Sequence, residues 1–93
     1  MLQLENRHQK IIQQILSKYP YTFYAYGSRV KGTAGKLSDL DLCYQEEIPW
    51  NVLSHIREDF ESSNLPFKAD LIFWEWMEPS FRELIAKDLT VLK

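Results

Sequence analysis

Residues 27 to 42 read Gly-Ser-Arg-Val-Lys-Gly-Thr-Ala-Gly-Lys-Leu-Ser-Asp-Leu-Asp-Leu. The stretch opens with two small residues, Gly27 and Ser28, directly after the strand-forming run Phe-Tyr-Ala-Tyr. It ends on Asp39 and Asp41, which are spaced i, i+2 within a second strand-like run. Because side chains alternate along a strand, both carboxylates are expected on one face and the leucines that follow them on the other.

The two ends of this stretch suit the chemistry of a metal-bound phosphate. At the small residues, backbone N–H groups and the Ser28 hydroxyl can approach a phosphate closely. Aspartate is a poor strand former, so two aspartates within one apolar strand need a reason. Two carboxylates on one face attract a divalent cation, and this indicates a metal site at Asp39 and Asp41.

A third carboxylate lies in a later strand-like run. Asp70 falls within Phe-Lys-Ala-Asp-Leu-Ile-Phe-Trp, and 28 residues separate it from Asp41. That length leaves room for a helix that crosses over and returns a neighbouring strand to the same sheet. An ionised aspartate in an apolar strand needs a cation or hydrogen bonds to offset its desolvation. We therefore expect Asp70 to join the other two acids.

The combination of Gly-Ser, ten intervening residues, Asp-x-Asp and a later Asp resembles the DNA polymerase β-type nucleotidyltransferase superfamily. The size of the chain and the stretch Gly-Ser-Arg-Val-Lys-Gly-Thr-Ala most resemble its minimal nucleotidyltransferase (MNT) proteins of prokaryotes. Lys31 and Val30 stand where that family often has Arg and Ala, and no catalytic position is missing. The resemblance implies an α/β (α+β) nucleotidyltransferase fold in a single domain, 1–93.

This resemblance also implies a Mg²⁺-dependent transfer of a nucleotide from ATP. Asp39 and Asp41 would hold two Mg²⁺ ions, and Asp70 would complete the metal site and activate the acceptor hydroxyl. Gly27 and Ser28 would fix the β- and γ-phosphates. The other residues expected to bind the nucleotide or its phosphates are Arg29, Lys31, Lys36 and Ser38.

The chain has no additional domain that would bind an acceptor. Minimal nucleotidyltransferases resemble one half of a two-component module whose other half is a helical HEPN protein, often a ribonuclease toxin. The resemblance therefore implies an antitoxin that forms a hetero-oligomer with such a toxin and transfers AMP from ATP to one of its tyrosines. Two alternatives stay open: an antitoxin that binds nucleotide but neutralises its partner by contact alone, and a subunit of a small-molecule nucleotidyltransferase.

Composition limits the other possible functions. The net charge is −2, with six basic residues against one acid in residues 1 to 36 and five against twelve in the remainder. Such a chain has no continuous basic stripe, so direct nucleic-acid binding is not expected. The single cysteine, Cys43, excludes an intrachain disulfide and suits a reducing compartment. No run has the length of a signal peptide core or a membrane span, and we expect a cytoplasmic protein without membrane contact.

Hydrophobic periodicity predicts the order αβαβαβα, typical of one α/β layer fold with a small mixed sheet. The expected elements are a helix at 3 to 18, strands at 21 to 26, 38 to 45 and 67 to 74, a helical turn at 28 to 34, and helices that begin at Pro49 and Pro79. Alternation along the third strand would place Trp74 and Trp76 on one face near the acids. There they could stack on an adenine or anchor a partner.

Overall fold

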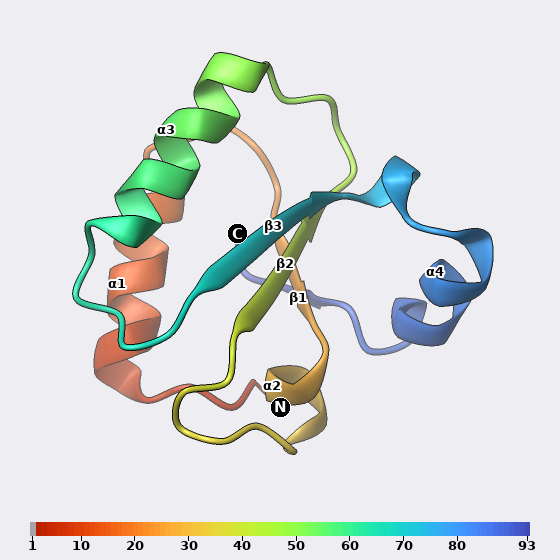
Figure 1. The fold of residues 1–93 in the computed structure, drawn as a ribbon, viewed down its shortest axis with the longest axis horizontal. Helices are drawn as coiled ribbons and strands as arrows, with labels where there is room; N and C mark the ends of the chain where they lie inside the picture. The colour runs from red at the N-terminus through yellow and green to blue at the C-terminus, as the bar shows by residue number, and fades with distance from the viewer. Residues whose placement is uncertain (1) are drawn as a thin grey trace.

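The computed structural model describes residues 2–93 and confirms the α/β fold class (Figure 1). Its elements agree with the expected order αβαβαβα, and a short final strand that the sequence analysis did not predict follows them. In chain order they are α1 (Asn6–Leu16), β1 (Tyr24–Tyr26), α2 (Ser28–Lys31), β2 (Leu40–Tyr44), α3 (Trp50–Glu61), β3 (Ala69–Phe73), the 3-10 helix η1 (Trp74–Trp76), α4 (Pro79–Ala86) and β4 (Thr90–Val91).

The sheet has the strand order β3-β2-β1-β4. The first strand, β1, pairs antiparallel with both β2 and β4, whereas β2 pairs parallel with β3. A parallel pair needs a crossover between its strands, and α3 lies in that connection. The sheet is therefore mixed, as the sequence predicts.

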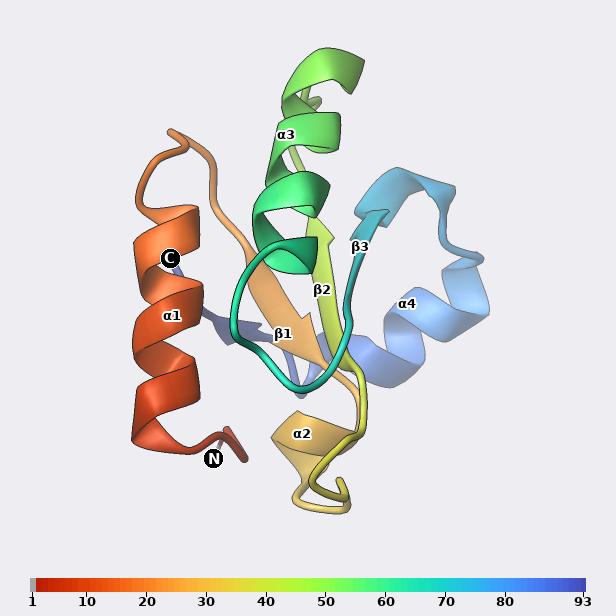
Figure 2. The same cartoon turned by 60° about the vertical axis from the view of Figure 1, so that its left-hand side comes forward.

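The main core lies between the sheet and helices α1 and α3, which cover one of its faces (Figure 2). Fully buried residues of this core include Ile12 and Leu16 from α1, Ile56 from α3, and Leu40 and Leu42 from β2. Their helical and alternating spacings place each of them on the covered side. Burying one such side chain stabilises the fold by about 2 kcal/mol relative to leaving it exposed.

A smaller cluster lies on the other face of the sheet, beneath α4. It contains Tyr26, Cys43, Met77 and Ile85. Burial raises the pKa of the Cys43 thiol to about 11, so the thiol stays protonated and acts as a packing residue. The odd-numbered residues of β2, including Asp41, face this side, and α4 covers only part of it.

The third strand ends sooner than the sequence predicts. It stops at Phe73, and Trp74–Trp76 form a 3-10 helix, so strand alternation does not govern the two tryptophans. Trp74 packs against the smaller cluster, whereas Trp76 is 76% exposed and meets the ring of Phe73 edge-on at 5.9 Å between centroids. The expected strand positions of Trp74 and Trp76 are therefore wrong. Within residues 2–93, no helix is long and apolar enough to cross a membrane.

Candidate active site

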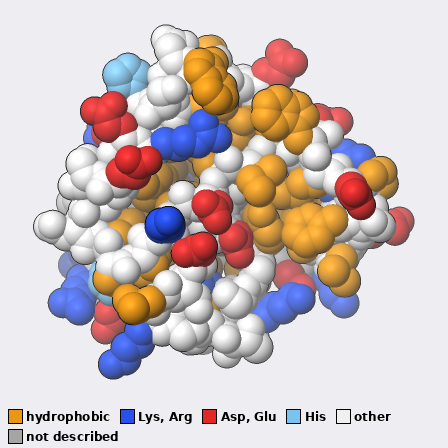
Figure 3. Space-filling view, viewed as in Figure 1, with side chains coloured by type: hydrophobic (Ala, Val, Ile, Leu, Met, Phe, Trp, Pro, Cys, Tyr) orange, Lys and Arg blue, Asp and Glu red, His pale blue; other side chains and the backbone are white. Residues whose placement is uncertain are grey.

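Two of the three predicted acids are direct neighbours across the parallel strand pair. Asp41 of β2 is in register with Asp70 of β3, and Tyr26 of β1 pairs with Asp41 from the other side. Asp39 lies just before β2 and is exposed, so strand alternation directs it to the same face as Asp41. Acidic side chains gather near the centre of this face, over β2 and β3 (Figure 3). The structure thus brings the three acids to one place.

The charges of these acids affect each other. The pKa of Asp41 is raised, first by burial, then by the negative charge of Asp70 and then by that of Asp39. All three causes disfavour the ionised form of a half-buried carboxylate. A bound cation would reverse this effect, because it favours the charged state of each acid around it.

A glycine backbone lies against the central acid. Gly27 connects β1 to α2 with φ 84° and ψ −154°, a region that is essentially restricted to glycine. A Cβ atom at this position would lie 2.5 Å from Oδ2 of Asp41. The close approach of backbone and carboxylate therefore requires glycine for two independent reasons, conformation and space.

The other residues expected near the phosphates surround this turn. Ser28 is the first residue of α2 and is half-buried. The Ser38 hydroxyl accepts a hydrogen bond from the Gly35 N–H at 2.8 Å, which closes the loop before β2. Lys31 and Lys36 are exposed, and neither forms an ion pair with another of residues 2–93. Their roles as phosphate ligands stay predictions.

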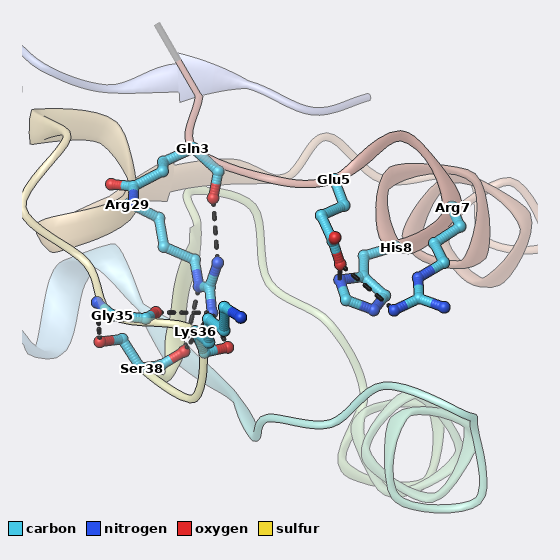
Figure 4. Close-up of polar contacts among 8 residues, drawn as sticks. All are labelled: Gln3, Glu5, Arg7, His8, Arg29, Gly35, Lys36 and Ser38. Atoms are coloured by element: carbon cyan, nitrogen blue, oxygen red, sulfur yellow. Dashed lines mark hydrogen bonds and ion pairs between the residues drawn. The ribbon is translucent and has the colours of Figure 1, made fainter.

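Arg29 lies elsewhere than the sequence analysis expected. It is 5% exposed, and its guanidinium donates hydrogen bonds to backbone carbonyls rather than pointing to solvent (Figure 4). The acceptors are the carbonyl of Ser38 at 3.0 and 2.8 Å, that of Gln3 at 2.9 Å and that of Lys36 at 3.2 Å. The ring of Phe67 lies 3.9 Å from the guanidinium carbon.

This arrangement gives Arg29 a structural role that the sequence analysis did not predict. Its donors are occupied by the loop that leads into Asp39, and the same guanidinium joins that loop to the N-terminal segment at Gln3. Arginine can bridge several carbonyls because its donors form a rigid planar fork. The expected phosphate contact of Arg29 stays a prediction.

Three neighbours of the acids were not recognised in the sequence. Tyr26 is buried beside Asp41, and its pKa is raised to about 12 by burial, then by Asp41, Cys43 and Asp70, so its phenol is neutral. The sequence held one signal for Tyr26: it stands one residue before Gly27 and alternates with Tyr24 along β1. Lys68 stands two residues before Asp70 in the run quoted above, whereas only the fold brings Arg57 of α3 to the same cleft.

A cleft of about 1000 Å³ lies beside the acids, between β3 and α3. Its lining combines apolar side chains with both signs of charge. Six of its residues are Leu37, Asp39, Arg57, Phe60, Lys68 and Asp70. The acids therefore adjoin a space large enough for a ligand or a peptide segment.

The donor set suits magnesium that arrives with phosphate. Within residues 2–93, no group of three or more His, Cys, Asp and Glu side chains has the arrangement needed to hold a metal ion by itself. The Asp41–Asp70 pair nevertheless offers two hard oxygen donors side by side. Magnesium in proteins is usually bound by one or two carboxylates together with substrate phosphates, so this pair fits that mode of binding.

Comparison with known proteins defines the class of this fold and site. The model of the family described as polymerase beta, nucleotidyltransferase matches residues 9–93. The chain belongs to this nucleotidyltransferase family, and the resemblance seen in the sequence is confirmed.

Two known proteins are similar to the chain over most of its length. A Haemophilus influenzae protein described as "probable protein adenylyltransferase MntA" is 42% identical over 85 residues, which cover 89% of this chain and 73% of that protein. A crystal structure of a toxin–antitoxin with AMP-PNP has a TM-score of 0.68 at 18% identity, covering 91% of this chain and 72% of that one. The structural match confirms the fold.

Replacing Gly27 with alanine should destabilise the protein by about 2 kcal/mol more than replacing Gly32, measured by urea denaturation. Both glycines have positive φ, 84° and 79°, but a Cβ at Gly32 meets nothing within 4 Å. Gly32 is in the left-handed helical region, which other residues adopt at lower cost, so the difference between the two variants combines the backbone conformation of Gly27 with its contact to Asp41. Equal destabilisation would show that this contact does not limit the turn.

Replacing Arg29 with lysine should lower the free energy of unfolding by about 2 kcal/mol, because lysine leaves several carbonyls without their donor. Replacing Arg7 with lysine is the matched control, since the Arg7 side chain is 78% exposed and pairs only with Glu5. Urea denaturation measures both. An unchanged stability together with weaker ATP binding would instead restore Arg29 as a phosphate ligand.

In metal-free buffer with a chelator, Asp41→Asn should be more stable than the wild type at neutral pH. The folded pKa of Asp41 lies above its ordinary 3.8, so the folded state binds this proton more tightly and stability falls as pH rises through the folded pKa. The advantage of the variant should shrink as pH is lowered toward 3.8.

The control substitution, Asp59→Asn, is expected to change stability in the opposite direction. The pKa of Asp59 is lowered, chiefly by the hydrogen bond from Tyr19, so Asp59→Asn should lose stability at neutral pH and approach the wild type in acid. Denaturation curves across this pH range measure both variants. If Asp41→Asn is less stable than wild type at neutral pH, the carboxylate is stabilising and our account of its repulsion is wrong.

Proposed function

We propose that this protein is an antitoxin that transfers AMP from ATP to a tyrosine of a helical toxin partner of the HEPN type. The observation that carries the proposal is the Asp41–Asp70 pair beside the Gly27 turn. Membership of the nucleotidyltransferase family supplies the reaction class. The adenylyltransferase similarity at 42% identity supports a protein as the acceptor.

The residues of the site have different roles in the transfer of AMP. Gly27 and Ser28 bind the β- and γ-phosphates, and Asp39 and Asp41 face the phosphate that is transferred. The tyrosine oxygen forms a bond to the α-phosphorus, the bond from that phosphorus to pyrophosphate breaks, and the proton passes to the carboxylate of Asp70. Magnesium, when bound with ATP, neutralises the acids and stabilises the charge on the phosphates.

The partner requirement follows from what lies around the acids. Ile72, Phe81 and Trp76 are exposed, at 40%, 40% and 76%. Ile72 lies on the same face of β3 as Asp70. Phe81 meets the ring of Tyr26, which pairs with Asp41. Hydrophobic side chains cover that side of the face viewed in Figure 3. Exposed aromatic and aliphatic side chains beside a reactive site favour a protein surface as the occupant.

Co-expression with the product of the adjacent reading frame tests this function. With ATP and Mg²⁺, the helical partner should co-purify and gain the mass of one or a few AMP groups on tyrosine, measured by intact-mass and peptide mass spectrometry. Asp41→Asn and Asp70→Asn should abolish the gain. Asp88→Asn, an acid of the α4–β4 connection, is the matched control and should leave it unchanged.

Three results would each contradict part of the proposal. A partner that stays unmodified yet is neutralised equally by Asp41→Asn would show an antitoxin that acts by binding alone. If the protein has no protein partner and modifies small molecules, it is a subunit of a small-molecule nucleotidyltransferase, the second alternative given by the sequence analysis. ATP binding that is equally tight in excess EDTA, measured by calorimetry, would remove the metal from the proposed site.

A further inference from the structure

Gln3, in the segment before α1, is bound to α2 and to the loop that follows it by four hydrogen bonds. Its backbone N–H donates to the Arg29 carbonyl at 2.6 Å, and its carbonyl accepts from the Arg29 guanidinium at 2.9 Å (Figure 4). Its side-chain amide donates to the Ala34 carbonyl at 2.8 Å and accepts from the Ala34 N–H at 3.1 Å. The backbone and the side chain of one residue therefore hold two successive parts of the chain.

The residues on either side of Gln3 attach its segment to the main core. Leu2 and Leu4 are half-buried and pack against that core, whereas Gln3 between them is exposed. Gln3 also precedes residues 9–93, which match the nucleotidyltransferase family, so the match assigns it no role. The side chain of Gln3 thus connects an anchored segment to the loop at Ala34.

The α2–β2 loop, residues 32–39, has no apolar anchor of its own. None of residues 32–39 is buried, and the one large apolar side chain among them, Leu37, is 70% exposed. Within the loop, the Gly35 N–H donates to the Ser38 hydroxyl at 2.8 Å, and the Ser38 N–H donates to the Gly35 carbonyl at 3.2 Å. A loop held by exposed polar contacts opens easily, so its order depends on the hydrogen bonds that Gln3 and Arg29 make to it.

Asp39 is the acid whose position depends most on this loop. Strand pairing holds Asp41 opposite Asp70, whereas Asp39 comes before the first paired residue of β2. The Ser38 carbonyl, directly before Asp39, accepts hydrogen bonds from Arg29 at 3.0 and 2.8 Å. Any movement of the loop therefore reaches Asp39 before it can affect the other two acids.

We propose that Gln3 is a positioning residue for nucleotide transfer: it orders the α2–β2 loop, so that Asp39 faces the site before ATP binds. This proposal rests on the proposed function, in which Asp39 faces the phosphate that is transferred. Without the Gln3 side chain, the loop loses two hydrogen bonds and has to become ordered when ATP binds with Mg²⁺. That ordering weakens binding, whereas the bound state and its rate of transfer stay the same.

Amide hydrogen exchange of the isotope-labelled protein, without ATP, tests the ordering of the loop. Gln3→Met keeps a side chain of similar length and removes the amide group that bonds Ala34. Exchange should become about tenfold faster at Gly35 and Ser38, a factor that corresponds to two exposed hydrogen bonds at the lower end of their usual worth. The N–H groups of these two residues bond within the loop rather than to Gln3. Unchanged exchange at both amides would show that the loop is ordered without Gln3 and would overturn the proposal.

Calorimetry and transfer kinetics test the consequence for the reaction. With Mg²⁺ present, Gln3→Met should raise the Kd and the KM for ATP by a similar factor and leave kcat and the KM for the partner protein unchanged. Gln13→Met is the matched control, because the Gln13 side chain also donates to a carbonyl, that of Leu92 at 2.7 Å, and bonds none of residues 32–39. This control should lower stability in urea but keep the wild-type constants for ATP. Circular dichroism checks that both variants are folded.

The outcomes separate this proposal from the proposed function. If Gln3→Met binds ATP and transfers AMP with the constants of the wild type, or if Gln13→Met changes them equally, Gln3 is not a positioning residue, although the adenylyltransferase function stands. If Gln3→Met loosens the loop and weakens ATP binding but the wild type modifies no partner protein, Gln3 orders the nucleotide site as proposed and the proposed function fails.

Discussion

The contact between the Gly27 backbone and the Asp41 carboxylate determines the layout of the site. It requires a residue without a side chain at the end of β1, and it fixes the turn that leads into α2. The same carboxylate is flanked by Asp70 on the neighbouring strand. The central acid is therefore enclosed by backbone on one side and by like charge on the other, a high-energy arrangement that suits a cation and a phosphate.

The surrounding structure compensates for this arrangement with rigid contacts. Arg29 hydrogen-bonds the loop before Asp39 and the N-terminal segment at Gln3, so the exposed acid is carried by an ordered backbone. Tyr26 contributes an uncharged phenol on the buried side of Asp41. Tyr26 is uncharged, and the guanidinium of Arg29 donates its hydrogen bonds to backbone carbonyls.

Much of the fold and the acid cluster could be predicted from the sequence, because each rests on local patterns. Alternation in β2 and the crossover length before Asp70 suffice to place the acids together. The short strand β4 was missed because two residues carry no measurable periodicity. The structural role of Arg29 could not be predicted, because an arginine that binds phosphate and one that binds buried backbone carbonyls cannot be told apart in the sequence. Lys68 lies two residues before Asp70 in the same run, whereas Arg57 reaches this region only through the packing of α3.

The parallel pairing of β2 with β3 also has a consequence for the order in which the protein is made. Synthesis proceeds from the N-terminus, so the Gly27 turn and Asp41 leave the ribosome before α3 and Asp70 do. A parallel strand cannot join the sheet until its crossover helix has formed and packed. The nascent chain consequently lacks a complete acid set until α3 has formed and β3 has joined β2.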